Sequence, residues 1–435
     1  MAQAYYTPVD VARALARHAP RRISSILEPA VGSGILLQPL LGRLSANASN
    51  IVCIDRNPSA LAELDRIRSS LPVGSLKVFC SDFLNWAKTP QTQKCEFDCI
   101  LMNPPFAAKR SEFVEVSYHS DVTDLVVRRV PVEAAFIATA IGLLKNGGRL
   151  LAILPSSVIA TDSCRWLREH LLNVGCVQYV HELPPFTFEK VSARVYLFVF
   201  EKCSNQRTLI LMNHDLAEPE KLRVDNRRLG PNLRFDYGWN HASATLQSLE
   251  GNKRRLNWRT LGEVATILRG EVDSPKGVEN AVHTTCYLNG FWRRPNGKRP
   301  RVGVSNRRIG RDDLLVKRVG RNCSKTIGPV LDASGYAASD CVTIIRTHKP
   351  SQRLQILFAL RVLLAGEIGG ALLESGAGAS YLTNAQLLDT KVPVNLASAY
   401  PKIFSRYILA LRRRSFSDVL RLENQARKIL FRCQP

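Results

Sequence analysis

Short apolar runs alternate with helix-length stretches through residues 1–200, and this alternation restricts the fold more than any other feature. A helix-length stretch at residues 130–145 ends at Asn146-Gly147-Gly148, which is a helix stop signal. Apolar strands separated by helices predict an α/β fold with a doubly wound, mostly parallel sheet covered on both faces. In such sheets ligands bind outside the carboxyl ends of the strands, near the point where the strand order reverses. The strand-like runs cover residues 23–29, 50–55, 75–82, 97–105, 148–157, 175–182 and 193–202.

Basic residues are concentrated in the second half of the chain. The 435 residues carry 60 Lys and Arg against 37 Asp and Glu, a net charge of +23. Residues 1–200 hold 21 basic and 17 acidic side chains, whereas residues 201–435 hold 39 and 20. A near-neutral half followed by a strongly basic half indicates one domain for chemistry and another for binding a polyanion, either nucleic acid or an anionic membrane surface.

Composition argues against several classes of protein. An apolar content of 45% is too high for an extended disordered chain. The longest apolar run is interrupted by Lys145, Asn146 and Arg149, so no membrane-spanning helix is expected, and the N-terminus lacks the apolar core of a signal peptide. The 11 cysteines include no CxxC pair, so we expect no metal site, reduced thiols, a cytoplasmic location and no membrane partner.

The carboxyl ends of the first three strand-like runs carry glycines or acids. The first ends in Glu28, followed by a turn with Gly32 and Gly34 that allows the backbone to approach a ligand closely. The second ends in Asp55, near the spacing from the first strand at which an acid accepts ribose hydroxyls. The third ends in Asp82-Phe83, an acid and an aromatic ring suited to an adenine. Each signal is weak alone, and their order makes them more specific.

The tetrapeptide Asn103-Pro104-Pro105-Phe106 follows the fourth run and is the most specific signal in the sequence. Two consecutive prolines fix the chain and leave carbonyl groups without local N–H partners. The Asn103 side-chain oxygen and the Pro104 carbonyl can accept both hydrogens of an exocyclic amine, which directs its lone pair at an electrophilic methyl group. Phe106 offers a face for stacking on a base. The alternative is a structural turn that caps a strand, and the three preceding strand ends favour the catalytic interpretation.

Together these motifs resemble the gamma class of S-adenosylmethionine-dependent adenine amino-methyltransferases that act on DNA. The likeness covers residues 1–203, with Phe106 where that class more often has tyrosine. It implies a Rossmann-like methyltransferase sheet, S-adenosyl-L-methionine as cofactor, and N6 methylation of a flipped adenine in double-stranded DNA. The implied setting is a system like type II restriction-modification, or a related defence or epigenetic system. The motifs occur in the order of the class: Thr7-Pro8, residues 28–34, Asp55, Asp82-Phe83, Asn103–Phe106 and residues 185–193.

The resemblance also implies a role for each motif residue. Asn103 and Pro104 would hold the target amine, with Phe106 as the third catalytic residue. Phe106 and Phe186 would stack on the base, and Phe188 is the alternative to Phe186. Thr7 is expected to cap a helix that begins at Pro8. The expected cofactor-binding residues are Thr7, Pro8, Glu28, Ala30, Gly32, Gly34, Asp55, Asp82, Phe83 and Pro105.

The basic half is expected to bind the nucleic acid. Residues 204–257 have mixed charge and are interpreted as a connector. Residues 258–435 resemble the α+β target recognition domains of related methyltransferases and of type I specificity subunits. Their last segment, residues 401–432, is predicted as a basic helix that packs on this domain or lies along DNA. The predicted DNA-binding residues follow the aromatic Trp292, with a solvated cationic loop as the alternative; they are Arg293, Arg294, Lys298, Arg299, Arg301, Arg307 and Arg308.

Residues 107–130 lack a clear period and are expected to form a loop. Two interpretations of this loop stay open: a loop beside the DNA, or a plain surface loop. In the first case the residues that would contact phosphates are Lys109, Arg110, Arg128 and Arg129.

Other functions use similar motifs. Protein glutamine methyltransferases share an Asn-Pro-Pro-aromatic tetrad, RNA adenine methyltransferases are also basic, and a DNA-binding specificity protein could keep the fold without activity. The strongly basic second half argues against the first, and intact Glu28, Asp55, Asp82 and Asn103 argue against the last. We therefore expect a monomeric DNA adenine methyltransferase whose further partner is a separate restriction endonuclease.

Overall fold

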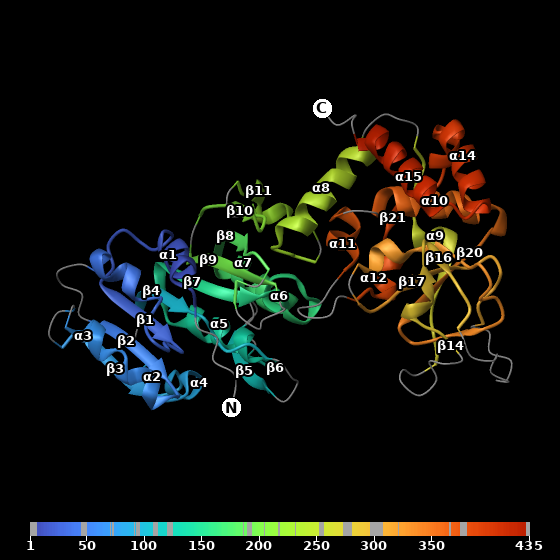
Figure 1. The fold of residues 1–435 in the computed structure, drawn as a ribbon. Coiled ribbons are helices and arrows are strands. Elements are labelled where there is room, and N and C mark those ends of the chain that lie inside the picture. Colours follow the sequence, from blue (N-terminus) through green and yellow to red (C-terminus); the bar gives the residue numbers. More distant parts are fainter. Residues whose placement is uncertain are drawn as a thin grey trace. The chain divides into compact units, whose positions relative to one another are not determined.

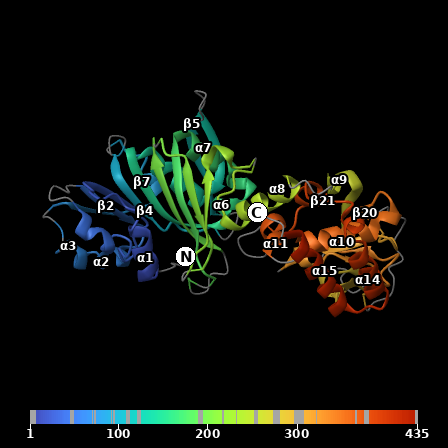
Figure 2. The same cartoon turned by 90° about the horizontal axis from the view of Figure 1, so that it is seen from above.

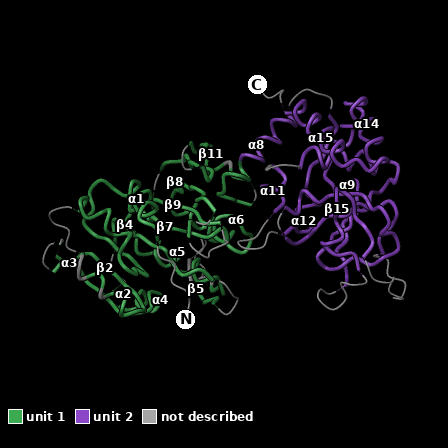
Figure 3. The backbone as a smooth tube through the Cα atoms, viewed as in Figure 1, with its two compact units in different colours: residues 1–240 green, residues 241–435 purple. Residues whose placement is uncertain are grey.

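The computed structural model describes most of the chain and divides it into two compact units, residues 1–240 (unit 1) and residues 241–435 (unit 2) (Figure 3). The described residues are 7–44, 50–69, 71, 74–90, 92, 96–107, 112–119, 125–185, 187–188, 194–203, 205–215, 218–230, 232–251, 256–272, 281–295, 308–320, 322–364, 367–374 and 381–431.

A single twisted sheet forms the centre of unit 1 (Figures 1 and 2). The pairs β3–β2, β2–β1, β1–β4, β4–β7 and β8–β10 are parallel. Strand β9 runs antiparallel to both of its neighbours, and β11 runs antiparallel to β10. In the described residues the strand order is β11 (Lys221–Asp225), β10 (Thr208–Met212), β8 (Gly175–Glu182), β9 (Val195–Lys202), β7 (Leu144–Pro155), β4 (Phe97–Met102), β1 (Ser25–Pro29), β2 (Asn50–Asp55) and β3 (Leu76–Cys80).

The strand order reverses beside β1. The chain runs outward from β1 through β2 to β3, and then returns to place β4 on the other side of β1. The predicted mostly parallel sheet is confirmed, and its switch point lies between β1 and β4, where ligands of doubly wound sheets bind.

Alternate residues of the central strands enter two separate cores, one on each face of the sheet. Leu27 belongs to one core together with residues of α5 (Val132–Gly142) and α7 (Arg165–Val174). Its neighbour Ile26 belongs to the other, with residues of α1 (Val9–Ala16) and the 3-10 helix η1 (Gln38–Arg43). Because side chains alternate along a strand, this arrangement requires strands that are apolar on both sides, as the sequence predicts.

The boundary of unit 1 lies further along the chain than predicted. The region interpreted as a connector, residues 204–257, instead supplies β10, β11 and the start of α8 (Tyr237–Gly251). Leu209 and Leu211 of β10 are fully buried, and this burial attaches the segment to the sheet. With the boundary at residue 240, residues 241–435 hold 32 basic and 14 acidic side chains, so the charge asymmetry follows the structural division.

Residues 107–130 do not form the expected loop throughout. Strands β5 (Phe113–His119) and β6 (Leu125–Pro131) pair as an antiparallel hairpin that is separate from the main sheet (Figures 1 and 2). Val116 and Val130 are buried in the core, so the valines of this segment were a strand signal. The following helix α5 ends at Gly142 rather than at the predicted residue 145, because Leu144 already pairs with Phe97 in the sheet.

Unit 2 combines short strands with helices, as an α+β arrangement requires. Its four-stranded antiparallel sheet, within the described residues, has the order β13 (Ala265–Arg269), β20 (Val342–Thr347), β17 (Leu314–Lys317) and β18 (Gly328–Pro329). Strand β12 (Trp258–Thr260) pairs with β21 (Lys391–Pro393). The apolar helix α10 (Arg353–Leu364) is buried in the largest core of this unit.

The end of the chain forms two helices rather than one. They are α14 (Pro401–Arg412) and α15 (Phe416–Phe431), and Arg414 between them has a φ of 57°, which stops the first helix. Tyr407 of α14 and Leu422 of α15 are buried in the same core as α10. The prediction that this segment packs on its own domain is confirmed. No helix in the described part of the chain is long and apolar enough to span a membrane.

Candidate active site

The turn after β1 has a backbone that favours glycine. Ala30, Gly32 and Gly34 have φ angles of 60°, 53° and 73°. A Cβ on Gly34 would lie 2.7 Å from Cδ1 of Ile67, so a side chain here would adopt an unfavourable φ and would also displace the end of the Ile67 side chain. The turn is thereby held close to the end of β1, at the switch point of the sheet.

Asp55, at the end of β2, stabilises the same turn through a hydrogen bond. Its Oδ2 accepts a hydrogen bond from the Gly32 amide at 2.8 Å, and its Oδ1 accepts one from the Asn57 amide at 2.9 Å. The Val31 amide also donates to the Ile54 carbonyl at 3.0 Å. The structure therefore brings together the first two motifs that the sequence singles out.

Glu28 lies beneath this turn and is only 1% exposed. Burial raises the pKa of the Glu28 carboxyl well above its usual range, and the nearby charge of Asp55 adds to the shift. Its Oε2 is buried and has no hydrogen-bond partner among the described residues. Because a buried carboxylate without a partner is costly, this oxygen is suited to a cationic or hydrogen-bond-donating ligand.

Asp82 and Phe83 follow β3 and face different surroundings. Asp82 caps the short helix α4 (Phe83–Trp86) by accepting from the Asn85 amide at 3.0 Å, and its Oδ2 lies 3.6 Å from Nε of Arg56. The Phe83 ring is 2% exposed, with its centroid 5.0 Å from that of Phe136. Asp82 is therefore at the strand end as predicted, whereas the Phe83 ring lies in the core and offers little surface to a ligand.

The tetrapeptide after β4 contacts the beginning of the chain. Nδ2 of Asn103 donates a hydrogen bond to Oγ1 of Thr7 at 3.1 Å, and Thr7 is 9% exposed. The helix α1 begins at Val9 with Pro8 as its N-cap, so the expectation that Thr7 caps a helix starting at Pro8 is wrong by one residue. Pro8 accepts the Ala12 amide through its carbonyl, and the Thr7 hydroxyl accepts from Asn103 instead.

Phe106 ends the tetrapeptide and is half-buried against the core on the α1 face of the sheet. The next residue, Ala107, donates its amide hydrogen to Oε2 of Glu133 at 2.9 Å. The hydroxyl of Ser157 donates to Oε1 of the same carboxylate at 2.8 Å. Glu133 is not among the residues that the motifs predict; the only signal was one acid at the start of an otherwise apolar helix.

A family comparison covers most of unit 1. The model of the family described as N-6 DNA Methylase matches residues 2–231, which is more than half of the chain. The chain belongs to the N-6 DNA Methylase family. Unit 1, residues 1–240, is therefore called the methylase unit below.

The methylase is also similar to individual proteins. It is 25% identical over 174 residues to the type II methyltransferase M.BsuBI of Bacillus subtilis, a match covering 36% of this chain and 34% of the relative. The match thus spans about a third of that curated relative's length. Among solved structures, the type IIG restriction endonuclease BpuSI has 13% identity and a TM-score of 0.47, covering 98% of this chain and 66% of that one. A type I methyltransferase subunit from Streptococcus thermophilus has 23% identity and a TM-score of 0.39, covering 49% and 48%.

Several predicted residues of the methylase unit lie away from the strand ends or outside the described residues. Phe188, the alternative to Phe186, is 5% exposed and belongs to the core on the α1 face. Arg128 and Arg129 are exposed on β6 of the hairpin. The residues that fall outside the described part are Phe186, Lys109 and Arg110.

Of the predicted DNA-binding residues in unit 2, Arg293, Arg294 and Arg308 are described, and all are exposed. Trp292, interpreted as the aromatic entry to this basic stretch, is instead fully buried, and its indole N–H donates to the Leu315 carbonyl at 2.9 Å. That tryptophan is a core residue. The predicted residues outside the described part are Lys298, Arg299, Arg301 and Arg307.

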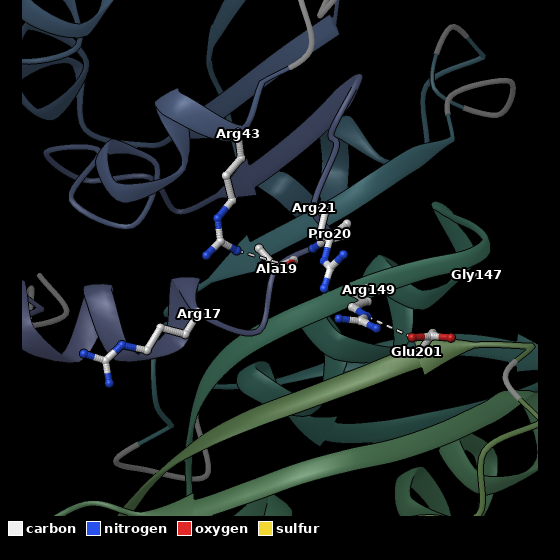
Figure 4. A pocket seen from close by; sticks show the side chains of 8 residues that line it. All are labelled: Arg17, Ala19, Pro20, Arg21, Arg43, Gly147, Arg149 and Glu201. Carbon is white, nitrogen blue, oxygen red and sulfur yellow. Dashed lines mark hydrogen bonds and ion pairs between the residues drawn. The ribbon is translucent and has the colours of Figure 1, made fainter.

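A cavity of about 690 Å³ lies at the amino edge of the methylase sheet, which is the edge opposite the strand ends that carry the predicted site residues (Figure 4). Arg149 forms an ion pair with Glu201 at 2.8 Å, and Arg43 donates to the Ala16 carbonyl at 2.8 Å. Arg149 also donates to the His18 carbonyl at 2.9 Å, so both arginines already contact the α1 segment or the residues that follow it. In the described residues no three His, Cys, Asp or Glu side chains gather as a metal site would require.

Proposed function

We propose that this chain is a site-specific DNA methyltransferase that transfers a methyl group from S-adenosylmethionine to the N6 amine of adenine. The observation that carries the proposal is the orientation of Asn103 at the switch point of the sheet. Its amide nitrogen donates to Thr7, so its amide oxygen faces away from Thr7. A fixed side-chain oxygen beside the Pro104 carbonyl is suited to accept the hydrogens of an exocyclic amine.

The residues around the glycine turn fit the cofactor. The buried Oε2 of Glu28, which lacks a partner in the described residues, suits the ammonium group of the methionine end. The turn with Gly32 and Gly34 allows close approach of the backbone, Asp55 retains lone pairs for ribose hydroxyls, and Asp82 would accept from the adenine amine. When bound, S-adenosylmethionine supplies a methyl group whose C–S electron pair leaves with sulfur, while the attacked amine releases one proton.

The target base must leave the duplex to reach these residues. Asn103 lies at the end of β4, inside the fold rather than on a protruding element, and an adenine within stacked DNA cannot contact it. We infer that the base flips, with Phe106 stacking on one face and Phe186 on the other. Pro105 follows the amine-binding pair and would pack beside the cofactor.

The basic residues would hold the DNA. Residues 241–435 carry the excess of basic side chains, which supports unit 2 as the target recognition domain. Exposed Arg293, Arg294 and Arg308 would bind phosphates or bases, and Arg128 and Arg129 of the hairpin would bind phosphates beside the flipped base. A monomer acting with a separate restriction endonuclease is the arrangement we propose.

The experiment is transfer of a radiolabelled methyl group to duplex DNA, with tRNA, rRNA and protein substrates in parallel. We expect label in DNA alone, and methylation-aware sequencing of DNA from expressing cells would give the base and its context. Asn103→Ala should abolish transfer while DNA binding persists, whereas Asn173→Ala, at an exposed position on α7, should leave transfer unchanged. Full activity of Asn103→Ala, or label in RNA or protein instead of DNA, would overturn the proposal.

A further inference from the structure

Glu133 is a buried carboxylate in the first turn of α5, among apolar neighbours. It is 2% exposed, and Ala134, Ala135 and Phe136, which follow it, all belong to the core. An acid is rarely buried in such surroundings unless its oxygens accept hydrogen bonds. Apolar packing alone would be satisfied better by leucine or methionine, so the carboxylate must serve the groups that it contacts.

Those groups come from the two strand ends beside the Asn103–Phe106 tetrapeptide. Oε2 accepts from the amide of Ala107, the residue directly after Phe106, at 2.9 Å. Oε1 accepts from the hydroxyl of Ser157, in the first turn of α6 (Ser156–Ala160), at 2.8 Å. Helix α6 follows β7, which is the parallel neighbour of β4. One carboxylate therefore connects the end of β4, the start of α5 and the end of β7.

The same contact closes the base of the β5–β6 hairpin. The chain leaves the tetrapeptide at Ala107, forms the hairpin, and returns at Pro131, two residues before Glu133. The hydrogen bond between Ala107 and Glu133 thus joins the two ends of the chain segment that contains the hairpin. This bond lies between the tetrapeptide and the first strand of the hairpin.

The two hydrogen bonds stabilise the buried carboxylate of Glu133. Burial raises the pKa of the Glu133 carboxyl, and the hydrogen bonds from Ala107 and Ser157 oppose that shift. Hydrogen bonds to a buried charged group are stronger than neutral ones, and losing a partner leaves the other groups unsatisfied. Replacing the carboxylate therefore affects the Ala107 amide more than it affects the apolar packing around it.

We propose that Glu133 is a positioning residue for methyl transfer, which holds the backbone after Phe106 so that Asn103, Pro104 and Phe106 keep their places relative to the target base. The inference rests on the proposed function. Glu133 does not touch the substrate; it acts through Ala107. Its loss should slow the transfer step and leave the binding of DNA and cofactor unchanged.

The test uses the full chain with Glu133→Gln, because glutamine keeps the size of the side chain, leaves one accepting oxygen for two donors and removes the charge that strengthens the bond to the Ala107 amide. We expect the single-turnover transfer rate to fall by about 10- to 100-fold, the range for a slightly displaced catalytic group. The dissociation constants for duplex DNA and S-adenosylmethionine should stay within about twofold, less than the loss of one hydrogen bond would cause. The matched control is Glu169→Gln, an exposed glutamate on α7, which should leave all three quantities unchanged.

A second variant and a second measurement keep the inference testable. Ser157→Ala removes only one of the two hydrogen bonds, so it should fold normally and slow transfer by a smaller factor. Hydrogen–deuterium exchange of residues 103–107 reports on the backbone directly. Pro104 and Pro105 have no amide hydrogens, so the signal comes from Asn103, Phe106 and Ala107. Faster exchange is expected in Glu133→Gln and not in Glu169→Gln.

The outcomes separate this inference from the proposed function. Absence of methyl transfer to DNA by the wild-type protein would overturn the function, and exchange would still decide whether Glu133 holds the tetrapeptide. Unchanged exchange and an unchanged transfer rate in folded Glu133→Gln would overturn the inference alone. So would a loss of activity that follows entirely from weaker binding of DNA or cofactor.

Discussion

Nδ2 of Asn103 lies 3.1 Å from Oγ1 of Thr7, across 96 residues of sequence, and donates a hydrogen bond to it. Thr7 is buried, so this bond restricts rotation of the Asn103 side chain. A primary amide has one accepting and one donating end, and only the accepting end can hold an amine by its hydrogens. The segment before α1 thereby orients the side chain that the proposed chemistry needs most.

We expect Thr7→Val to slow methyl transfer by about 3- to 10-fold, the kinetic equivalent of one hydrogen bond worth about 1 kcal/mol. Valine keeps the shape of threonine and removes the hydroxyl, so Asn103 can rotate. Thr7→Ser retains the hydroxyl and is the control. Single-turnover rates at saturating DNA and cofactor would measure the effect, and a loss in Thr7→Ser as large as that in Thr7→Val would show that the effect is not specific to the hydroxyl.

Gly34→Ala should destabilise the protein more than Gly32→Ala does. Both positions have positive φ, which costs an alanine about 1–2 kcal/mol. At Gly34 a Cβ would also lie 2.7 Å from Ile67 and 2.8 Å from Leu64, which adds about 1–3 kcal/mol of overpacking. A Cβ on Gly32 would have no such neighbour within 4 Å. Urea unfolding of the two variants would compare these free energies, and equal losses would contradict the steric argument.

The stability contributed by Glu28 should depend on pH. Burial and the charge of Asp55 raise the pKa of this carboxyl in the folded protein well above 4.5, so the folded state binds its proton more tightly than the unfolded chain does. The free energy of unfolding of the wild type is therefore highest below the ordinary pKa of 4.5, and it falls as pH rises through the raised pKa of the folded protein. Glu28→Gln cannot ionise and should gain stability relative to the wild type over that rise.

Urea unfolding of both proteins between about pH 5 and pH 8 would measure this difference. The control is Glu169→Gln on α7, which makes the same substitution away from the glycine turn. The same Glu28→Gln variant should bind S-adenosylmethionine more weakly, since it lacks the charge that the ammonium group would meet. Parallel stability curves for Glu28→Gln and the wild type would contradict the assignment.

Replacing Arg293, Arg294 and Arg308 together by glutamine should weaken DNA binding and reduce its salt dependence. Each phosphate contact that is lost should lower the slope of log K against log salt by about 0.9 for duplex DNA. The control replaces three exposed arginines of the C-terminal helices, Arg412, Arg413 and Arg421, which changes the net charge equally. Fluorescence anisotropy over a salt series would compare them, and equal slopes would show that only the overall charge attracts DNA.

The sequence alone could identify the central sheet, the order of its strand ends and the tetrapeptide, because these depend on local patterns. Apolar runs such as residues 50–55 indicate burial on both sides, and Asp55 marks the strand end without knowledge of its neighbours. The position of β10 could not be derived in this way, since a short run between charged segments becomes a strand only when β8 pairs with it.

The family-level chemistry was therefore determined by the sequence, whereas the tertiary structure decided which side chains act together. The basic residues after Trp292 suggest that this tryptophan contacts nucleic acid. In the structure it lies in the core, where the carbonyls of Leu315 and Thr326 accept hydrogen bonds from its indole N–H. Glu133 has no motif around it and yet connects Ala107 with Ser157. Residue patterns record burial and chain direction within a segment, but a hydrogen bond between residues far apart exists only once the strand order has brought their ends to one edge of the sheet.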